Sequence, residues 1–243
     1  MPPRLFVDAP LAAAARLALP ERAARHVQVL RLQPGAALTL FDGRGGEWSA
    51  EVMAMARRGA EVRTLEHHAR EAELPIAVTL ALAMPANDRM DALVEKATEL
   101  GVMAIVPLTT ERSVLRLAGE RAERRQAHWQ AIAVAACEQC GRNRVPAIHV
   151  AQPFAAWLGG MSAVAAGERR LLLGWRDAAP WPVAAARLGS VLTLLSGPEG
   201  GLTDDEEDLA CRRGFAVASL GARTLRADTA PLAALAAIAV AAA

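Results

Sequence analysis

The sequence predicts a two-domain protein of the mixed α/β class, with a small barrel-like β domain followed by a larger α/β domain. Short β-like runs separated by turns occupy residues 1–72. A polar stretch, residues 66–73, then leads to Pro75 and is typical of a linker, which places the second domain at residues 73–243. From residue 76 onward strand and helix patterns alternate, which favours a mostly parallel sheet covered on both faces.

Composition limits the kinds of protein that this chain can be. Apolar residues make up 53% of the 243 positions and charged residues 22%, which excludes a disordered chain. The formal net charge is only +1, so an RNA-binding face must come from local clusters of arginine. The three cysteines are typical of a reducing compartment, and no signal peptide or membrane-spanning run is expected. These features together predict a cytoplasmic protein without a membrane partner.

The first domain contains four strand candidates and one helix. The strand-like runs cover residues 5–7, 37–41, 48–53 and 61–65, and a helix is predicted over residues 21–30. Residues 41–48 read Phe-Asp-Gly-Arg-Gly-Gly-Glu-Trp. Because apolar runs flank the Asp-Gly and Gly-Gly pairs, this stretch predicts a β-hairpin.

The second domain alternates between strands and helices. Its strand candidates are residues 76–84, 104–108, 171–173, 191–195 and 216–220. Helices are predicted over residues 88–100, 120–139, 204–213 and 231–240. In the first of these helices the apolar residues recur with helical spacing, and Gly101 stands at the position that ends a helix.

The loops after the strands are the candidate binding site, because ligands of open α/β sheets bind at the carboxyl ends of the strands. The most informative loop contains Gly197, Gly200 and Gly201, whose missing side chains allow a ligand to approach the backbone. Thr203 and Glu206 then form a capping-box pattern at the start of the next helix. Four acidic residues at 204–207 would repel a phosphate, and neither a dinucleotide fingerprint nor a P-loop is present. A neutral or cationic ligand is therefore favoured.

Several motifs lie in a characteristic order along nearly the whole chain. They are Arg25-His-Val27, Phe41-Asp-Gly43, Glu95-Lys-Ala-Thr-Glu-Leu-Gly-Val102, Glu111-Arg-Ser113, Ala136-Cys-Glu-Gln-Cys-Gly-Arg142, Gly197-Pro-Glu-Gly-Gly201 and Leu220-Gly-Ala-Arg-Thr-Leu-Arg-Ala-Asp-Thr-Ala230. Together they resemble the RsmE family, the ribosomal RNA small subunit methyltransferase E branch of the SPOUT methyltransferases. The chain departs from the family pattern in the last motif, with Thr224 in place of the usual Ile and Asp228 in place of Glu.

The resemblance implies a fold, a reaction and partners. The fold would be a PUA-like β-barrel domain over residues 1–72 and a SPOUT domain with a deep trefoil knot over residues 73–243, an exception to unknotted topology. The enzyme would act as a homodimer and transfer a methyl group from S-adenosyl-L-methionine to N3 of a uridine near the decoding site. Its partner would be 16S rRNA within the small ribosomal subunit.

The resemblance and the loops together give the candidate site residues. Cofactor contacts are expected from Leu173, Gly174, Leu195, Ser196, Gly197, Pro198, Glu199, Gly200, Gly201, Leu220, Gly221, Arg223, Leu225 and Thr229. Arg223 and Arg226 are the candidates to stabilise negative charge on the uracil, and Arg226 is assigned this role; Glu138 is the candidate base, with water as an alternative. RNA contacts are expected from Arg25, His26, Arg31, Arg112, Gln139 and Arg142.

Other interpretations stay open at this point. Cys137 and Cys140 have redox or zinc spacing, but no second pair of ligands has matching spacing, so a structural role is favoured and no metal site is expected. The reaction could instead be ribose 2′-O-methylation of tRNA or ribosomal RNA. A third reading is a non-catalytic RNA-binding module that keeps the pocket without turnover.

Overall fold

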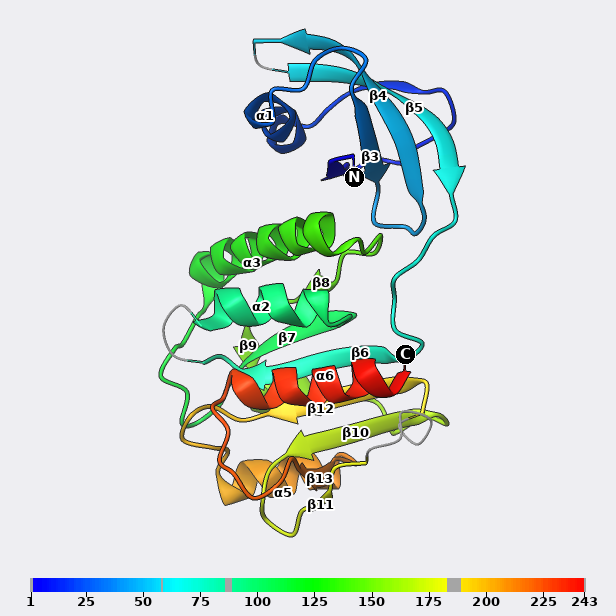
Figure 1. The fold of residues 1–243 in the computed structure, drawn as a ribbon. Coiled ribbons are helices and arrows are strands. Elements are labelled where there is room, and N and C mark those ends of the chain that lie inside the picture. The colour runs from blue at the N-terminus through cyan, green and yellow to red at the C-terminus, as the bar shows by residue number, and fades with distance from the viewer. Residues whose placement is uncertain (1, 58, 86–88, 183–188, 243) are drawn as a thin grey trace. The chain divides into compact units, whose positions relative to one another are not determined.

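The chain forms two units in the computed structural model, which describes residues 2–57, 59–85, 89–182 and 189–242 (Figure 1). The first unit contains the residues up to Glu73 together with Val134–Val145. The second contains Leu74–Ala133 and the chain from Pro146 onward. Val134–Val145 thus groups by its contacts with the N-terminal part of the chain, although it lies far along the sequence.

A mixed five-stranded sheet forms the first unit, with the strand order β1-β3-β4-β5-β2. Its strands are β1 (Arg4–Phe6), β2 (Arg16–Ala18), β3 (Ala37–Phe41), β4 (Glu47–Ala56) and β5 (Gly59–His68). The β1–β3 pair is parallel and the other pairs are antiparallel. The predicted hairpin is confirmed, because Leu40 pairs with Trp48 across it. Strand β2 was not predicted, because it is a short edge strand whose residues are exposed or half-buried and form no apolar run.

Helix α1 (Glu21–Val29) packs on this sheet and ends one residue before the predicted boundary. Its buried side is small, with Ala23, Ala24 and Val27 against the sheet. The core of the unit is closed by branched side chains from four strands, namely Leu5, Leu38, Leu40, Val52 and Val62. Small helix residues against branched strand residues let the helix approach the sheet closely.

An eight-stranded parallel sheet forms the second unit, which confirms the prediction of a mostly parallel sheet. Its strands are β6 (Ala77–Ala83), β7 (Ala104–Thr109), β8 (Ala147–Ile148), β9 (Gln152–Pro153), β10 (Glu168–Leu173), β11 (Ala179–Pro180), β12 (Val191–Ser196) and β13 (Ala216–Ser219). The order is β11-β13-β10-β12-β6-β7-β8, with β9 also paired to β7. The two-residue strands were not predicted because two residues carry no period.

The helices are α2 (Arg89–Glu99), α3 (Gly119–Cys140), α4 (Phe154–Gly159), α5 (Asp204–Arg212) and α6 (Thr229–Ala242). Four of them agree with the prediction within two residues, although the predicted first position of α2, Asp88, lies outside the described residues. Helix α4 was not predicted. Helix α6 begins at Thr229, so that Pro231 stands in its first turn, where a proline leaves no helical hydrogen bond unmade.

Both faces of the parallel sheet are covered. One face packs Ala81, Leu172 and Leu195 against α4 and α5. Leu80 and Leu194 alternate with these residues along the strands and are also buried, on the side where α6 packs against β12 and α2 (Figure 1). Within the described ranges, none of the helices combines the length and the apolar character needed to cross a bilayer.

Candidate cofactor site

Three neighbouring strands, β13, β10 and β12, end at one edge of the parallel sheet. The loops that follow them begin at Leu220, Gly174 and Gly197. Because parallel strands carry their carboxyl ends to the same edge, these three loops meet there, as the sequence predicted. The ends of β10 and β12 that lead into the loops are mostly apolar and buried, which gives the loops a packed base.

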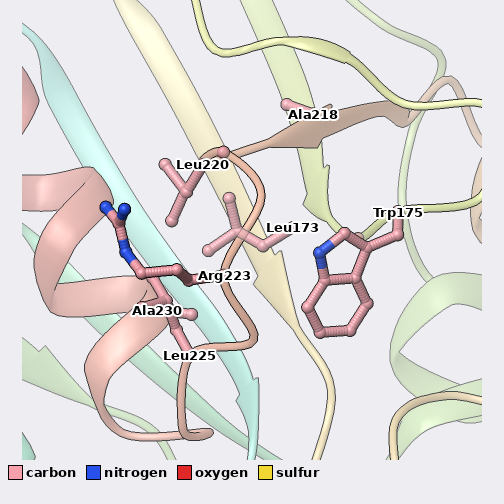
Figure 2. Close-up of a pocket in the computed structure, with 9 residues that line it drawn as sticks. Leu173, Trp175, Ala218, Leu220, Arg223, Leu225 and Ala230 are labelled. Atoms are coloured by element: carbon pink, nitrogen blue, oxygen red, sulfur yellow. The ribbon is translucent and has the colours of Figure 1, made fainter.

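The loops enclose a pocket and an adjoining cleft. Apolar side chains form most of the pocket wall, which Figure 2 shows converging from several segments: Leu173, Gly174, Trp175, Ala218, Leu220, Gly221, Arg223, Leu225 and Ala230. The cleft, of about 400 Å³, shares part of this lining and adds Ser196–Leu202, Glu207 and Thr224–Ala227. An apolar recess beside a more polar cleft suits a ligand with a flat apolar ring and a polar or charged part.

Glycine is required at the bend of the loop that follows β12. A Cβ atom on Gly197 would lie 3.0 Å from the backbone nitrogen of Leu202 and 3.2 Å from the carbonyl carbon of Gly201. Backbone atoms cannot move aside as the end of a side chain can, so any larger residue here would force the loop open. Gly201 adopts a φ of +70°, which also favours glycine.

Carboxylates give the cleft a negative wall. Burial raises the pKa of the Glu207 carboxyl above its ordinary value. Its Oε2 atom is buried and accepts no hydrogen bond from the described residues, although Nε of Arg176 lies 3.2 Å away. Arg176 also pairs with Asp204 and Asp208 on α5. Oε2 of Glu207 is therefore ion-paired with Arg176 but lacks a hydrogen bond from the described residues, and a donor group of a bound ligand would supply one.

The loop that follows β12 is hydrogen-bonded to the segment that follows β7. Nη1 of Arg112 donates hydrogen bonds to the carbonyl oxygens of Gly200, at 2.9 Å, and Leu202, at 3.1 Å. The backbone N–H of Glu111 donates to Oε1 of Glu206 at 2.9 Å. Arg89 lies 3.6 Å from the carboxylate of Glu199. Arg112 thus makes contacts with the loop, while its side chain is exposed and the expected RNA contact stays a prediction.

Most of the predicted cofactor residues line the pocket or the cleft. They are Leu173, Gly174, Ser196, Gly197, Pro198, Glu199, Gly200, Gly201, Leu220, Gly221, Arg223 and Leu225. Leu195 is not among the lining residues, because it points into the core with no exposed surface. Thr229 begins α6 and is also outside the lining.

The two candidate arginines differ in their placement. Arg226 lines the cleft and is exposed. Arg223 lines the pocket, but its guanidinium points away from Trp175 (Figure 2). Asp228, the shortened residue of the last motif, has a buried Oδ1 atom without a hydrogen-bond partner among the described residues.

Glu138 and Arg142 form hydrogen bonds and ion pairs within the first unit. Glu138 accepts a hydrogen bond from the backbone N–H of Phe6 at 3.1 Å and lies 3.3 Å from a guanidinium nitrogen of Arg22. Arg142 is only 2% exposed and pairs with Glu73, its Nε atom donating at 3.0 Å. The expectation that Arg142 contacts RNA is corrected, because its guanidinium is buried and already paired.

The remaining RNA candidates have accessible side chains in the first unit. Arg25 and Arg31 are exposed, Gln139 is exposed and His26 is half-buried. Arg31 follows α1 and adopts a φ of +55°, a left-handed conformation that normally favours glycine. The N–H of Leu32 bonds to the carbonyl of Val27 and that of Arg31 to Gln28, which is the Schellman pattern of a helix end. Arg31 thus occupies a left-handed position that glycine would adopt without strain.

Sequence reasoning missed several lining residues. Trp175 is 60% exposed at the pocket and directly follows the predicted Gly174, so its position after a strand was the available signal. Glu207 was noted only as part of an acidic turn, and nothing in the sequence showed that it faces the cleft. Ala218 lies in a predicted strand and Ala230 at the end of the last motif, and alanine is too frequent in this chain to mark a site.

Comparisons with known proteins agree with this geometry. Residues 72–239 match a family described as an RNA methyltransferase domain, and residues 19–65 match an RNA methyltransferase PUA domain. Ribosomal RNA small subunit methyltransferase E of Synechocystis is 38% identical over 216 residues, which cover 87% of this chain and 68% of that protein. The Bacillus subtilis protein of the same name is 33% identical, with 87% and 84% coverage.

Solved structures show the same relationship. The crystal structure of a ribosomal RNA small subunit methyltransferase E from Neisseria gonorrhoeae bound to S-adenosyl methionine superposes with a TM-score of 0.90. It is 37% identical in sequence, and the match covers 98% of this chain and 97% of that one. A methyltransferase from Legionella pneumophila in complex with the same cofactor has a TM-score of 0.87, 31% identity, and coverage of 99% and 97%.

Proposed function

Because the chain belongs to the ribosomal RNA small subunit methyltransferase E family, we propose that it methylates N3 of a uridine in 16S rRNA near the decoding site, with S-adenosyl-L-methionine as the donor. The observation that carries the proposal is the cleft at the ends of β10, β12 and β13. It combines glycine loops, an apolar recess and the half-buried carboxylate of Glu207, and it lies where open α/β sheets bind ligands.

The residues of the cleft fit this cofactor. Leu173, Leu220 and Leu225 offer an apolar wall for adenine, and the missing side chain of Gly197 keeps the loop backbone within reach of a ligand. Glu207 supplies a negative charge for the cationic part of the molecule. S-adenosyl-L-methionine, when bound, supplies an electrophilic methyl group on a positively charged sulfur.

Arg226 is the residue that we assign to the target base. Uracil N3 carries a proton that must leave for the nitrogen to accept a methyl group, and negative charge then develops on the ring. Arg226 lines the cleft with an exposed guanidinium, which stabilises this charge and orients the base through hydrogen bonds. We assign the role of proton acceptor to water and not to Glu138, because that carboxylate accepts a hydrogen bond from the N–H of Phe6 and pairs with Arg22.

RNA binding falls mainly to the first unit. Arg25 and Arg31 present exposed guanidinium groups on and just after α1, with His26 beside them. A chain with a net charge of only +1 binds RNA through such local clusters and not through its bulk charge. Gln139 is exposed and stays a candidate contact. The proposed partner is 16S rRNA within the small ribosomal subunit, in the cytoplasm.

We further propose a homodimer and a trefoil knot in the C-terminal domain. Helix α6 contains no charged residue, and Val240 on it is 80% exposed, so an apolar face is open to a second copy. The knot is proposed from the family resemblance, and the route of the chain from β13 past β10 to α6 against β12 is compatible with it. The residues between β13 and α6 are the ones that line the pocket.

Methyl transfer to small ribosomal subunits lacking their own modification tests the function. Methylation at N3 removes the Watson–Crick donor of uracil, so primer extension should stop at one decoding-site uridine only when the cofactor is present. Gly197→Val should abolish the stop, whereas Gly159→Val, where a Cβ meets no atom within 4 Å, should retain it. Methyl incorporation without this stop would move the target to a ribose or to tRNA. Cofactor binding with no incorporation would favour a non-catalytic RNA-binding module.

A further inference from the structure

The segment after β7 is a rigid turn that touches the glycine loop of the cleft. The backbone N–H of Thr110 donates to the hydroxyl of Ser113 at 2.9 Å, and the two hydroxyl oxygens also lie 2.9 Å apart. The N–H of Ser113 donates back to the carbonyl of Thr110 at 3.2 Å. Both residues are buried, so water does not compete for these bonds. The turn therefore holds Glu111 and Arg112 in fixed positions.

Arg112 reaches from this turn to two carbonyls on one side of the loop. A single guanidinium nitrogen donates to the carbonyl oxygens of Gly200 and Leu202, and the aliphatic stem packs against Gly200. A Cβ on Gly200 would lie 3.4 Å from two carbon atoms of that stem. The charge strengthens both hydrogen bonds, which set the direction of the Gly200–Gly201 and Leu202–Thr203 peptide groups.

The far end of the loop is fixed by the same turn. Oε1 of Glu206 accepts the N–H of Glu111, and Oε2 accepts the N–H of Thr203 at 3.0 Å. The hydroxyl of Thr203 in turn accepts the N–H of Glu206 at 3.3 Å. The loop is thus anchored at Gly200, Leu202 and Thr203, while its other side lines the cleft.

We propose that Arg112 is a positioning residue for cofactor binding: it orders the Gly197–Leu202 loop before S-adenosylmethionine arrives. The inference rests on the proposed function, since it concerns the same cleft. A loop that is ordered in advance loses less conformational entropy on binding, so affinity rises without any contact between Arg112 and the ligand. Charge-assisted hydrogen bonds of this kind correspond to about a 10- to 100-fold effect.

Calorimetric titration of the full-length protein with S-adenosylhomocysteine and S-adenosylmethionine measures this effect. Arg112→Ala should raise both dissociation constants by about 10- to 100-fold. Arg112→Lys should recover part of the affinity, since one ammonium still reaches one carbonyl. Arg121→Ala removes an exposed arginine of α3 that has no contact with the loop, and it should bind like the wild type. Hydrogen exchange without ligand should be faster at residues 197–203 in Arg112→Ala alone.

RNA binding separates this role from a direct RNA contact. Arg112→Ala should raise the KM for the cofactor and leave the affinity for small subunits, and its salt dependence, unchanged. Unchanged cofactor affinity in a folded Arg112→Ala protein would overturn the inference, as would a lower RNA affinity with a shallower salt dependence. Failure of the wild-type protein to bind the cofactor would instead overturn the proposed function. If Arg112→Ala does not fold, the cofactor affinity of the milder variant Arg112→Lys provides the comparison, with thermal unfolding as the check that this variant is folded.

Discussion

Replacement of Arg31 by glycine should make the protein more stable and less able to bind RNA. Arg31 holds a φ of +55° after α1, and the left-handed region costs a residue with a Cβ about 1–2 kcal/mol. Glycine avoids this cost, but its more flexible unfolded chain offsets about 0.4–1 kcal/mol of the gain. The net stabilisation of Arg31→Gly therefore lies between about 0 and 1.6 kcal/mol, with a centre of about 0.8 kcal/mol. For a unit of this size that is a rise of a few degrees in the unfolding midpoint, at about 4–8 °C per kcal/mol.

Arg31→Ala is the matched control, because it removes the guanidinium and keeps the strained backbone. Scanning calorimetry of the wild type and both variants should place only Arg31→Gly above the wild type. Filter binding to small-subunit RNA across a salt series should show equal losses for both variants, with a slope reduced by about one counterion. Equal stability of the glycine and alanine variants would refute the strain argument, and unchanged RNA affinity would refute the role of the side chain.

Two further predictions follow from the cleft and the cysteines. Burial raises the pKa of Glu207, so the wild type should lose cofactor affinity as the pH falls through that raised value, and Glu207→Gln should bind weakly and without this pH dependence. Because the pKa of Glu207 is higher in the folded state than in the unfolded state, the folded wild type must give up a proton as the pH rises from the ordinary glutamate range through the raised value, and it loses stability over that range. Glu207→Gln should not show this loss, which urea unfolding at several pH values would measure. Burial raises the pKa of Cys137 to about 12, so a thiol reagent should modify the exposed Cys211 in the native protein and reach Cys137 only after unfolding.

Local signals predicted the fold well because they act over a few residues. The capping box of Thr203 and Glu206 is present as predicted, with both reciprocal hydrogen bonds, and α5 begins there. The strand candidate 37–41 coincides with β3 because its alternation reflects a sheet with one buried face. The edge where three loops meet was predictable in the same way, since the order of strands and helices implies a parallel sheet.

Roles that depend on distant partners were not predictable. Nothing near Arg142 indicated that it pairs with Glu73, 69 positions earlier, in the interior of the first unit. The sequence alone does not show that Arg112 donates to the carbonyl of Gly200, because the two residues are far apart in the chain and meet only in the folded protein. The same holds for Glu207, whose burial depends on how α5 packs beside β10.

The membership of Val134–Val145 in the first unit means that this domain is discontinuous along the gene. The buried Arg4 donates to the side chain of Asn143 and the carbonyl of Arg142, and the N–H of Phe6 donates to Glu138. Residues 1–73 alone would leave these donors without their acceptors. The first unit therefore cannot be exchanged between relatives as a single N-terminal segment. Any recombination that transfers it must also transfer the end of α3, which ties the inheritance of the two halves together.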